Sequence, residues 1–187
     1  RVWELDSGRL LLTLSGHDGE VYDVAWSPDG TLLATAGVDG LGRLWDAASG
    51  ALRAVLRGHG AALHSIAFHP DGRRVATASA DRTVRLWDAA TGREQAVLRG
   101  HDELVYRVRF SQAGDRAVSA STDKTVRLWD TATGAQVLSL LYDEAVWGAH
   151  WSLDDERLLV LPMDGTVRVL DSLPFSRRAR PPGDPAA

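Results

Sequence analysis

The chain has 187 residues, of which 44% are apolar, and its 21 basic and 25 acidic residues give a formal net charge of −4 at pH 7. That charge excludes bulk electrostatic attraction to nucleic acid or to an anionic membrane as the basis of function, and no apolar run reaches the roughly 18 residues of a membrane span. Because the chain has no cysteine, it cannot hold a disulfide, a thiolate zinc site or a thiol nucleophile.

Short strands joined by tight turns are predicted along the whole chain. The first two strands lie at residues 1–3 and 9–14, and the units that follow alternate apolar and polar residues, as in Val84-Arg85-Leu86-Trp87, which is the period of a strand. The segment Ser27-Pro28-Asp29-Gly30 is a turn, because proline presets φ and glycine accepts a positive φ. No longer stretch has the period of an amphipathic helix, so an all-β protein is predicted.

The strands belong to a sequence unit that repeats with a step of 42 residues. Three separate markers keep this step, which chance does not produce, and each unit predicts four strands. A four-stranded antiparallel sheet cannot bury both of its faces alone, whereas sheets packed side by side around an axis cover one another. The markers are Gly16-His17, Gly58-His59 and Gly100-His101; Trp3, Trp45, Trp87 and Trp129, each followed by an acid; and Asp39, Asp81 and Asp123.

A unit that runs from Gly-His to Trp-Asp over about 40–45 residues resembles the WD40 repeat. The resemblance covers residues 1–172 and implies an all-β WD40 β-propeller arc of four-stranded antiparallel blades, with about four and a half repeats that can form an incomplete ring. The fourth repeat is eroded, because Leu141-Tyr142 replaces Gly-His and Leu170-Asp171 replaces Trp-Asp. The expected boundaries are a partial unit at 1–14, repeats at about 15–56, 57–98, 99–139 and 140–172, and a Pro/Arg-rich C-terminal tail at 173–187.

The resemblance also implies a buried hydrogen-bonded tetrad of His, Ser or Thr, Asp and Trp in each blade. Ser, His and Asp together also suggest a hydrolase. However, the set recurs in every unit, Thr replaces Ser in two of three, and no nucleophile motif accompanies it. We therefore predict a structural role, no catalytic residue and no enzyme. The positions are His17, Thr35, Asp39 and Trp45; His59, Thr77, Asp81 and Trp87; His101, Ser119, Asp123 and Trp129; and, in the eroded unit, Tyr142, Val160, Asp164 and Leu170, where only the acid is retained.

The sequence predicts neither a metal site nor a cofactor. His64 and His69 lie five residues apart, and no carboxylate pattern joins them into a ligand set. No glycine-rich phosphate loop precedes a helix.

Partner binding is expected on the propeller rim near the central channel. In the family, contact positions lie three and five residues after the motif His and just before the turn Asp. The second of these is aromatic in every unit, and such rings dominate binding hot spots; the alternative is that the rings pack on each other or line the channel wall. The positions are Glu20, Tyr22 and Val38; Ala62, His64 and Ala80; Leu104, Tyr106 and Thr122; and Ala145, Trp147 and Met163.

The expected function is a protein–protein interaction scaffold that binds a protein or peptide, without nucleic acid or membrane partners. One alternative is a regulatory or sensor module of a longer signalling protein such as a Ser/Thr kinase. Another is a propeller hydrolase, which would need convergent carboxylates or metal-binding histidines around the channel.

The ends of the chain leave three outcomes open. The chain is expected to be the C-terminal part of a longer WD40 protein. Two chains could instead self-associate through open blade edges, with residues 9–14 completing the sheet of residues 147–170, or one chain could close as a four-bladed ring. The single lysine, Lys124, indicates a bacterial origin, and a cytoplasmic location is expected.

Overall fold

A computed structural model describes residues 1–171 and consists there of β-strands and turns, without a helix. The all-β prediction is therefore confirmed. The predicted tail at 173–187 lies outside the described residues. In chain order the strands are β1 (Val2–Trp3), β2 (Leu10–Leu12), β3 (Val21–Trp26), β4 (Leu32–Gly37), β5 (Gly42–Asp46), β6 (Leu52–Leu56), β7 (Leu63–Phe68), β8 (Arg74–Ser79), β9 (Val84–Asp88), β10 (Glu94–Leu98), β11 (Val105–Phe110), β12 (Arg116–Ser121), β13 (Thr125–Asp130), β14 (Gln136–Leu141), β15 (Val146–Trp151), β16 (Arg157–Pro162) and β17 (Arg168–Asp171).

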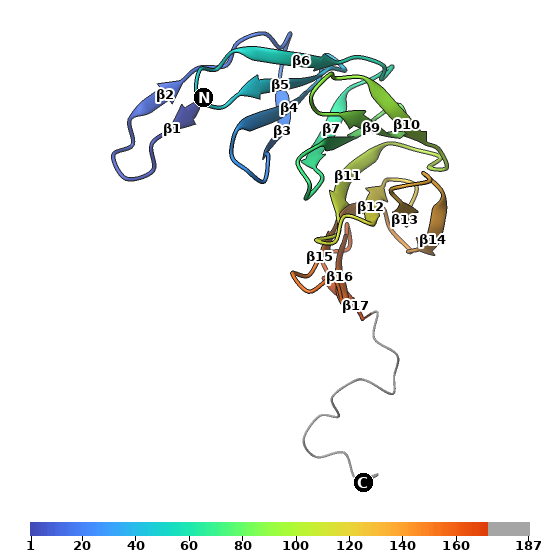
Figure 1. Ribbon diagram of the computed structural model, residues 1–187. Coiled ribbons are helices and arrows are strands. Elements are labelled where there is room, and N and C mark those ends of the chain that lie inside the picture. Colours follow the sequence, from blue (N-terminus) through green and yellow to red (C-terminus); the bar gives the residue numbers. More distant parts are fainter. Residues whose placement is uncertain (172–187) are drawn as a thin grey trace.

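The strands form five antiparallel sheets that follow one another in an arc (Figure 1). Three are complete four-stranded blades: the first is β3–β6, the second β7–β10 and the third β11–β14. The fourth blade has three strands, β15–β17, and the pair β1–β2 forms a half blade at the N-terminal end. The inner strands β3, β7, β11 and β15 lie along the concave side, and residues 1–171 do not close into a ring (Figure 1). The prediction of an incomplete propeller arc is confirmed.

A turn with fixed chemistry connects the third and fourth strands of each complete blade. In the first blade Asp46 ends β5 and accepts hydrogen bonds from the backbone N–H and the hydroxyl of Ser49, at 2.8 and 2.7 Å. Gly50 follows with φ of 73°, a conformation that glycine adopts without steric cost. Asp88 with Thr91 and Asp130 with Thr133 repeat this turn. The Trp-Asp motif therefore fixes where β5, β9 and β13 end.

The hydrophobic core lies between blades rather than within them. Ala34, Leu44 and Leu56 of the first blade pack with Ile66 and Trp87 of the second, and similar clusters join the second blade to the third and the third to the fourth. Fully burying one such aliphatic side chain contributes about 1.5–3 kcal/mol. Each blade is therefore stabilised mainly by its neighbours.

Candidate functional site

The structure brings together the four side chains of each complete tetrad. In the first blade His17 Nε2 lies 2.7 Å from Thr35 Oγ1, and Trp45 Nε1 donates to the same hydroxyl oxygen at 2.9 Å. His17 Nδ1 lies 3.1 Å from Asp39 Oδ1. In the second blade the distances are 2.7 Å for His59–Thr77, 2.8 Å for Trp87–Thr77 and 2.8 Å for His59–Asp81. In the third blade they are 2.7 Å for His101–Ser119, 2.8 Å for Trp129–Ser119 and 2.7 Å for His101–Asp123.

The hydroxyl group of each tetrad is poorly placed to attack a substrate. Thr77 and Ser119 are fully buried. Because the indole N–H can only donate, each hydroxyl accepts that bond and donates its own proton to the histidine Nε2. The other ring nitrogen, as N–H, then donates to the aspartate. A chain of bonds from Trp to Asp thus links two strands and the loop before the inner strand to the turn, which is the arrangement of a structural network.

The turn aspartates are held ionised by their hydrogen bonds. Burial by itself would raise the pKa of Asp39, but hydrogen bonds from Arg43 and His17 outweigh burial and lower that pKa to about 2. Burial opposes ionisation of Asp81 as well, and hydrogen bonds from His59 and Thr83 hold its pKa well below its usual range. The Asp81 carboxylate also accepts from the backbone N–H of Gly60, at 3.1 Å. It therefore fastens the loop before β7 to the turn after β8.

An arginine four residues after each turn aspartate was missed by sequence reasoning. Its guanidinium forms an ion pair with that aspartate in all four blades. The signal was present in the repeated Val-Arg-Leu-Trp segment, where the arginine recurs with the repeat. The pairs are Arg43–Asp39 at 2.8 Å, Arg85–Asp81 at 3.7 Å, Arg127–Asp123 at 3.9 Å and Arg168–Asp164 at 3.2 Å.

The eroded fourth blade keeps only the turn of its tetrad. Asp164 accepts hydrogen bonds from the backbone N–H and hydroxyl of Thr166, at 2.8 and 2.6 Å. Tyr142, at the histidine position, is buried, and Arg168 lies over its ring at 5.4 Å from the centroid. Val160, at the hydroxyl position, is fully buried in the cluster between the third and fourth blades. Apolar packing thus occupies the place of the polar network.

The aromatic residues expected on the rim sit at a β-bulge that recurs in every blade. In β3 the pairing with β4 shifts between Val21 and Asp23, so Tyr22 is the extra residue. The same shift occurs around His64, Tyr106 and Trp147. A bulge re-aims the side chain of the extra residue. These four residues are called the aromatic rim below.

The rings of the aromatic rim contact one another from blade to blade. The ring centroids of Tyr22 and His64 are 5.0 Å apart and stacked, those of His64 and Tyr106 are 5.4 Å apart and edge-on, and those of Tyr106 and Trp147 are 4.5 Å apart. The rings therefore do pack on each other. Tyr22 nevertheless remains 45% exposed and Trp147 51% exposed, so packing leaves an accessible aromatic row across four blades.

The other expected rim positions are joined in pairs by a repeated backbone hydrogen bond. In each blade the residue before the turn aspartate donates its N–H to the carbonyl of the residue three after the motif histidine. The structure therefore places both positions beside the aromatic rim; Glu20 and Met163 are exposed, and Leu104 and Thr122 are half-buried. The bonds are Val38–Glu20 at 2.9 Å, Ala80–Ala62 at 2.9 Å, Thr122–Leu104 at 3.0 Å and Met163–Ala145 at 2.8 Å.

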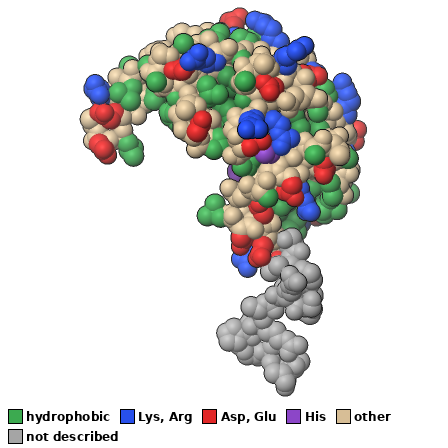
Figure 2. Space-filling model, in the orientation of Figure 1, with side chains coloured by type: hydrophobic (Ala, Val, Ile, Leu, Met, Phe, Trp, Pro, Cys, Tyr) green, Lys and Arg blue, Asp and Glu red, His purple; other side chains and the backbone are tan. Residues whose placement is uncertain are grey.

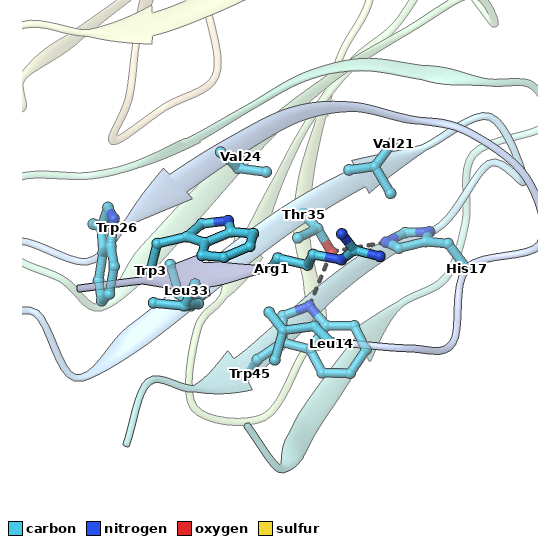
Figure 3. Close-up of a pocket in the computed structure, with 11 residues that line it drawn as sticks. Arg1, Trp3, Leu14, His17, Val21, Val24, Trp26, Leu33, Thr35 and Trp45 are labelled. Atoms are coloured by element: carbon cyan, nitrogen blue, oxygen red, sulfur yellow. Dashed lines mark hydrogen bonds between the residues drawn. The ribbon is translucent and has the colours of Figure 1, made fainter. Parts of the chain in front are cut away.

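An apolar pocket of about 460 Å³ lies between the half blade β1–β2 and the N-terminal side of the first blade. Its lining includes Trp3 of the half blade, Val24 and Trp26 of β3, and the tetrad residues His17 and Trp45. Figure 3 shows Trp26 and His17 toward opposite ends of the pocket, with Trp3 between them. The tetrad of this blade is therefore less enclosed than its equivalents in the second and third blades.

Within residues 1–171, no group of three or more His, Cys, Asp or Glu side chains is arranged to hold a metal ion. The same part of the chain contains no helix long and apolar enough to cross a membrane.

Three segments, residues 8–46, 50–88 and 92–130, match the family model described as WD domain, G-beta repeat, and together they cover more than half of the chain. The chain is 48% identical over 40 residues to coronin-7 of Rattus norvegicus, which is 21% of this chain and 4% of that protein. It is 54% identical over 33 residues to ribosome assembly protein 4 of Chaetomium thermophilum, which is 18% of this chain and 6% of that protein. The chain thus spans a small fraction of these relatives, and it belongs to the WD40-repeat family, whose members in general serve as protein-interaction scaffolds.

Proposed function

We propose that this chain is an interaction scaffold that holds a protein or peptide segment on the aromatic rim. The observation that carries the proposal is the row of four contacting rings, one from each blade, of which Tyr22 and Trp147 are about half exposed. Aromatic side chains supply large contact area at low entropic cost, because only two side-chain torsions must be fixed. A row of such rings suits an extended segment that crosses several blades.

The rim is also rigid enough to be a preformed binding surface. Each ring is positioned by a bulge and by its neighbour's ring, and the adjacent positions are tied by the repeated backbone hydrogen bond, as between Met163 and Ala145 at 2.8 Å. A preformed surface loses less entropy when a partner binds. The same rim would serve a free scaffold or a regulatory module within a longer signalling protein.

We infer no catalytic role for the tetrads. Their hydroxyl groups are buried and already bonded on both sides, to a histidine and to a tryptophan, as in Thr77. A hydrolase would instead need one accessible nucleophile in one cleft.

The proposal is tested by selecting peptides from a random display library on the native chain and measuring their dissociation constants. Replacing a central aromatic anchor typically costs about 2 kcal/mol or more, which is roughly 30-fold in affinity. Trp147→Ala and Tyr106→Ala are therefore expected to weaken the selected peptides by at least tenfold. Trp3→Ala is the matched control, since Trp3 is equally exposed at 52% but lies away from the rim. Peptides that bind both rim variants with native affinity would show that the rim is not the binding surface.

A further inference from the structure

A cluster of polar side chains lies directly beside the aromatic rim, and three of its members are the residues that follow the rim aromatic in the first three inner strands. Asp23 follows Tyr22 in β3, Ser65 follows His64 in β7, and Arg107 follows Tyr106 in β11. These residues are equivalent by the repeat, yet one is an acid, one a hydroxyl and one a base. The cluster therefore arises from differences between the blades and belongs to no tetrad.

Asp23 and Arg109 each have several hydrogen-bond partners in this cluster. Asp23 Oδ2 accepts from the Ser65 hydroxyl at 3.0 Å and from the Ile66 N–H at 3.1 Å. Arg109 donates to the Ser65 hydroxyl at 2.9 Å, to the Val108 carbonyl at 2.8 Å and to Asp23 at 3.4 Å. The Asp23 charge is thus neutralised by Arg109, and both groups have several close partners.

Arg107 has most of its hydrogen-bond donors unused within residues 1–171. Among the described residues its guanidinium makes one hydrogen bond, a long one of 3.4 Å to the already committed Asp23 Oδ2. A guanidinium carries five N–H donors, and the Arg107 side chain is 35% exposed. Its remaining donors are thus available on the inner-strand side of the arc. Figure 2 shows basic, acidic and histidine side chains gathered near the middle of that concave side.

The cluster carries one positive charge in excess. Two guanidinium groups, those of Arg107 and Arg109, face the single carboxylate of Asp23. Burial, followed by the charges of Arg109 and Arg107, lowers the pKa of the nearby His150, so this ring adds no charge at pH 7. A half-buried cation without a matched anion attracts one, and a guanidinium binds a carboxylate through two parallel N–H···O bonds.

We propose that Arg107 binds a carboxylate side chain of the partner segment while neighbouring apolar side chains of that segment lie on the aromatic rim. This rests on the proposed function and names the partner's chemistry: an acidic peptide segment. A single excess charge matches a singly charged carboxylate better than a doubly charged phosphate. Because Tyr106 and Arg107 are consecutive in β11, the acidic residue is expected next to, or one residue away from, an apolar residue of the partner.

The same peptide selection tests this assignment. Peptides that depend on Trp147 are expected to be enriched in Asp or Glu beside an apolar residue. Arg107→Gln should weaken the best acidic peptide at least tenfold, whereas Arg93→Gln, at an exposed arginine in the turn between β9 and β10, should leave it unchanged. A peptide with Asn or Gln in place of the acid should lose the same factor on the native chain and nothing further on Arg107→Gln. Unchanged unfolding midpoints check that both variants are folded.

The outcomes separate the two proposals. Peptides that require Trp147 but show no acidic enrichment, or amide versions that bind as tightly as the acids, would overturn the role of Arg107 and leave the rim as the binding surface. A library that yields no Trp147-dependent peptide would overturn both. A phosphoserine version that binds more tightly than the aspartate version would show that the site takes a phosphate, against the carboxylate assignment.

Discussion

The first blade and the two blades after it present the same kinds of residue to their N-terminal side, but only the later two are covered. Val24 is 61% exposed, whereas the equivalent residues Ile66 and Val108 are fully buried. The difference comes from the neighbour, because a complete blade covers the second and third blades and only the half blade β1–β2 lies beside the first. The sequence of a WD40 unit thus specifies an apolar face, and that face is buried only where an adjacent blade covers it.

The third and fourth blades give a second comparison. The third blade has the complete tetrad of His101, Ser119, Asp123 and Trp129, whereas the fourth has apolar packing around Val160. Both form antiparallel sheets with the same bulge in the inner strand. A buried polar network can be replaced by well-packed apolar groups at little cost, whereas removing one member of an intact network leaves the others unpaired.

The largest expected effect comes from breaking a complete tetrad. Asp81→Ala leaves donors of His59, Gly60 and Thr83 without their acceptor. At about 1–3 kcal/mol for each buried group left unpaired, we expect a loss of about 4 kcal/mol in the free energy of unfolding. Asp164→Ala is the matched variant in the eroded blade, where the carboxylate holds only its local turn and Arg168, and should cost about 1 kcal/mol. Urea unfolding measures both, and equal losses would show that the tetrad is not a cooperative network.

Much of this architecture could be predicted from the sequence, because the blades repeat the residues that define them. The step of 42 residues and the alternation of apolar residues predict the order of strands. The Gly-His and Trp-Asp markers predict a tetrad in each of the three complete blades, and the structure brings those side chains together, as at Thr77 and Ser119.

The features that the sequence did not predict depend on differences between the blades or on what lies next to each blade. The bulge at Tyr22 leaves no distinct sequence mark within a strand. The cluster of Asp23, Ser65 and Arg109 joins three blades through residues that the repeat does not conserve: Asp23 and Ser65 differ at equivalent positions, and Arg109 stands where the first two blades have Ala25 and Ala67. A search for repeated residues therefore does not find it. The exposure of Val24 depends on the adjacent blade, which the residues of its own unit cannot reveal.

The second expected effect tests the comparison of covered and open faces directly. Ile66→Ala removes a fully buried side chain from the core between the first and second blades and should cost about 3 kcal/mol. Val24→Ala changes the equivalent position on the open face and should cost less than about 0.5 kcal/mol. Unfolding is measured at several protein concentrations. A large, concentration-dependent cost for Val24→Ala would mean that a second copy covers this face in solution.

The smallest expected effect concerns the residue after each turn aspartate, which adopts a left-handed conformation in all four blades. The outer two blades have Gly40 and Gly165 there, with φ of 75° and 80°, whereas the middle two have Arg82 and Lys124, with φ of 72° and 68°. A non-glycine residue is strained in this region, but glycine loses more entropy on folding.

The relief of backbone strain and the larger entropy loss of glycine nearly cancel, so Arg82→Gly should stabilise the protein by only about 0.5 kcal/mol. Arg82 is the suitable site because its side chain is exposed, whereas the Lys124 ammonium donates to the Asp143 carbonyl at 2.7 Å. Gly165→Ala is the reverse test, since a new Cβ there meets nothing within 4 Å and the cost of about 1 kcal/mol reports on the backbone alone. A destabilised Arg82→Gly variant would show that side-chain contacts of Arg82 stabilise the protein by more than its backbone strain costs.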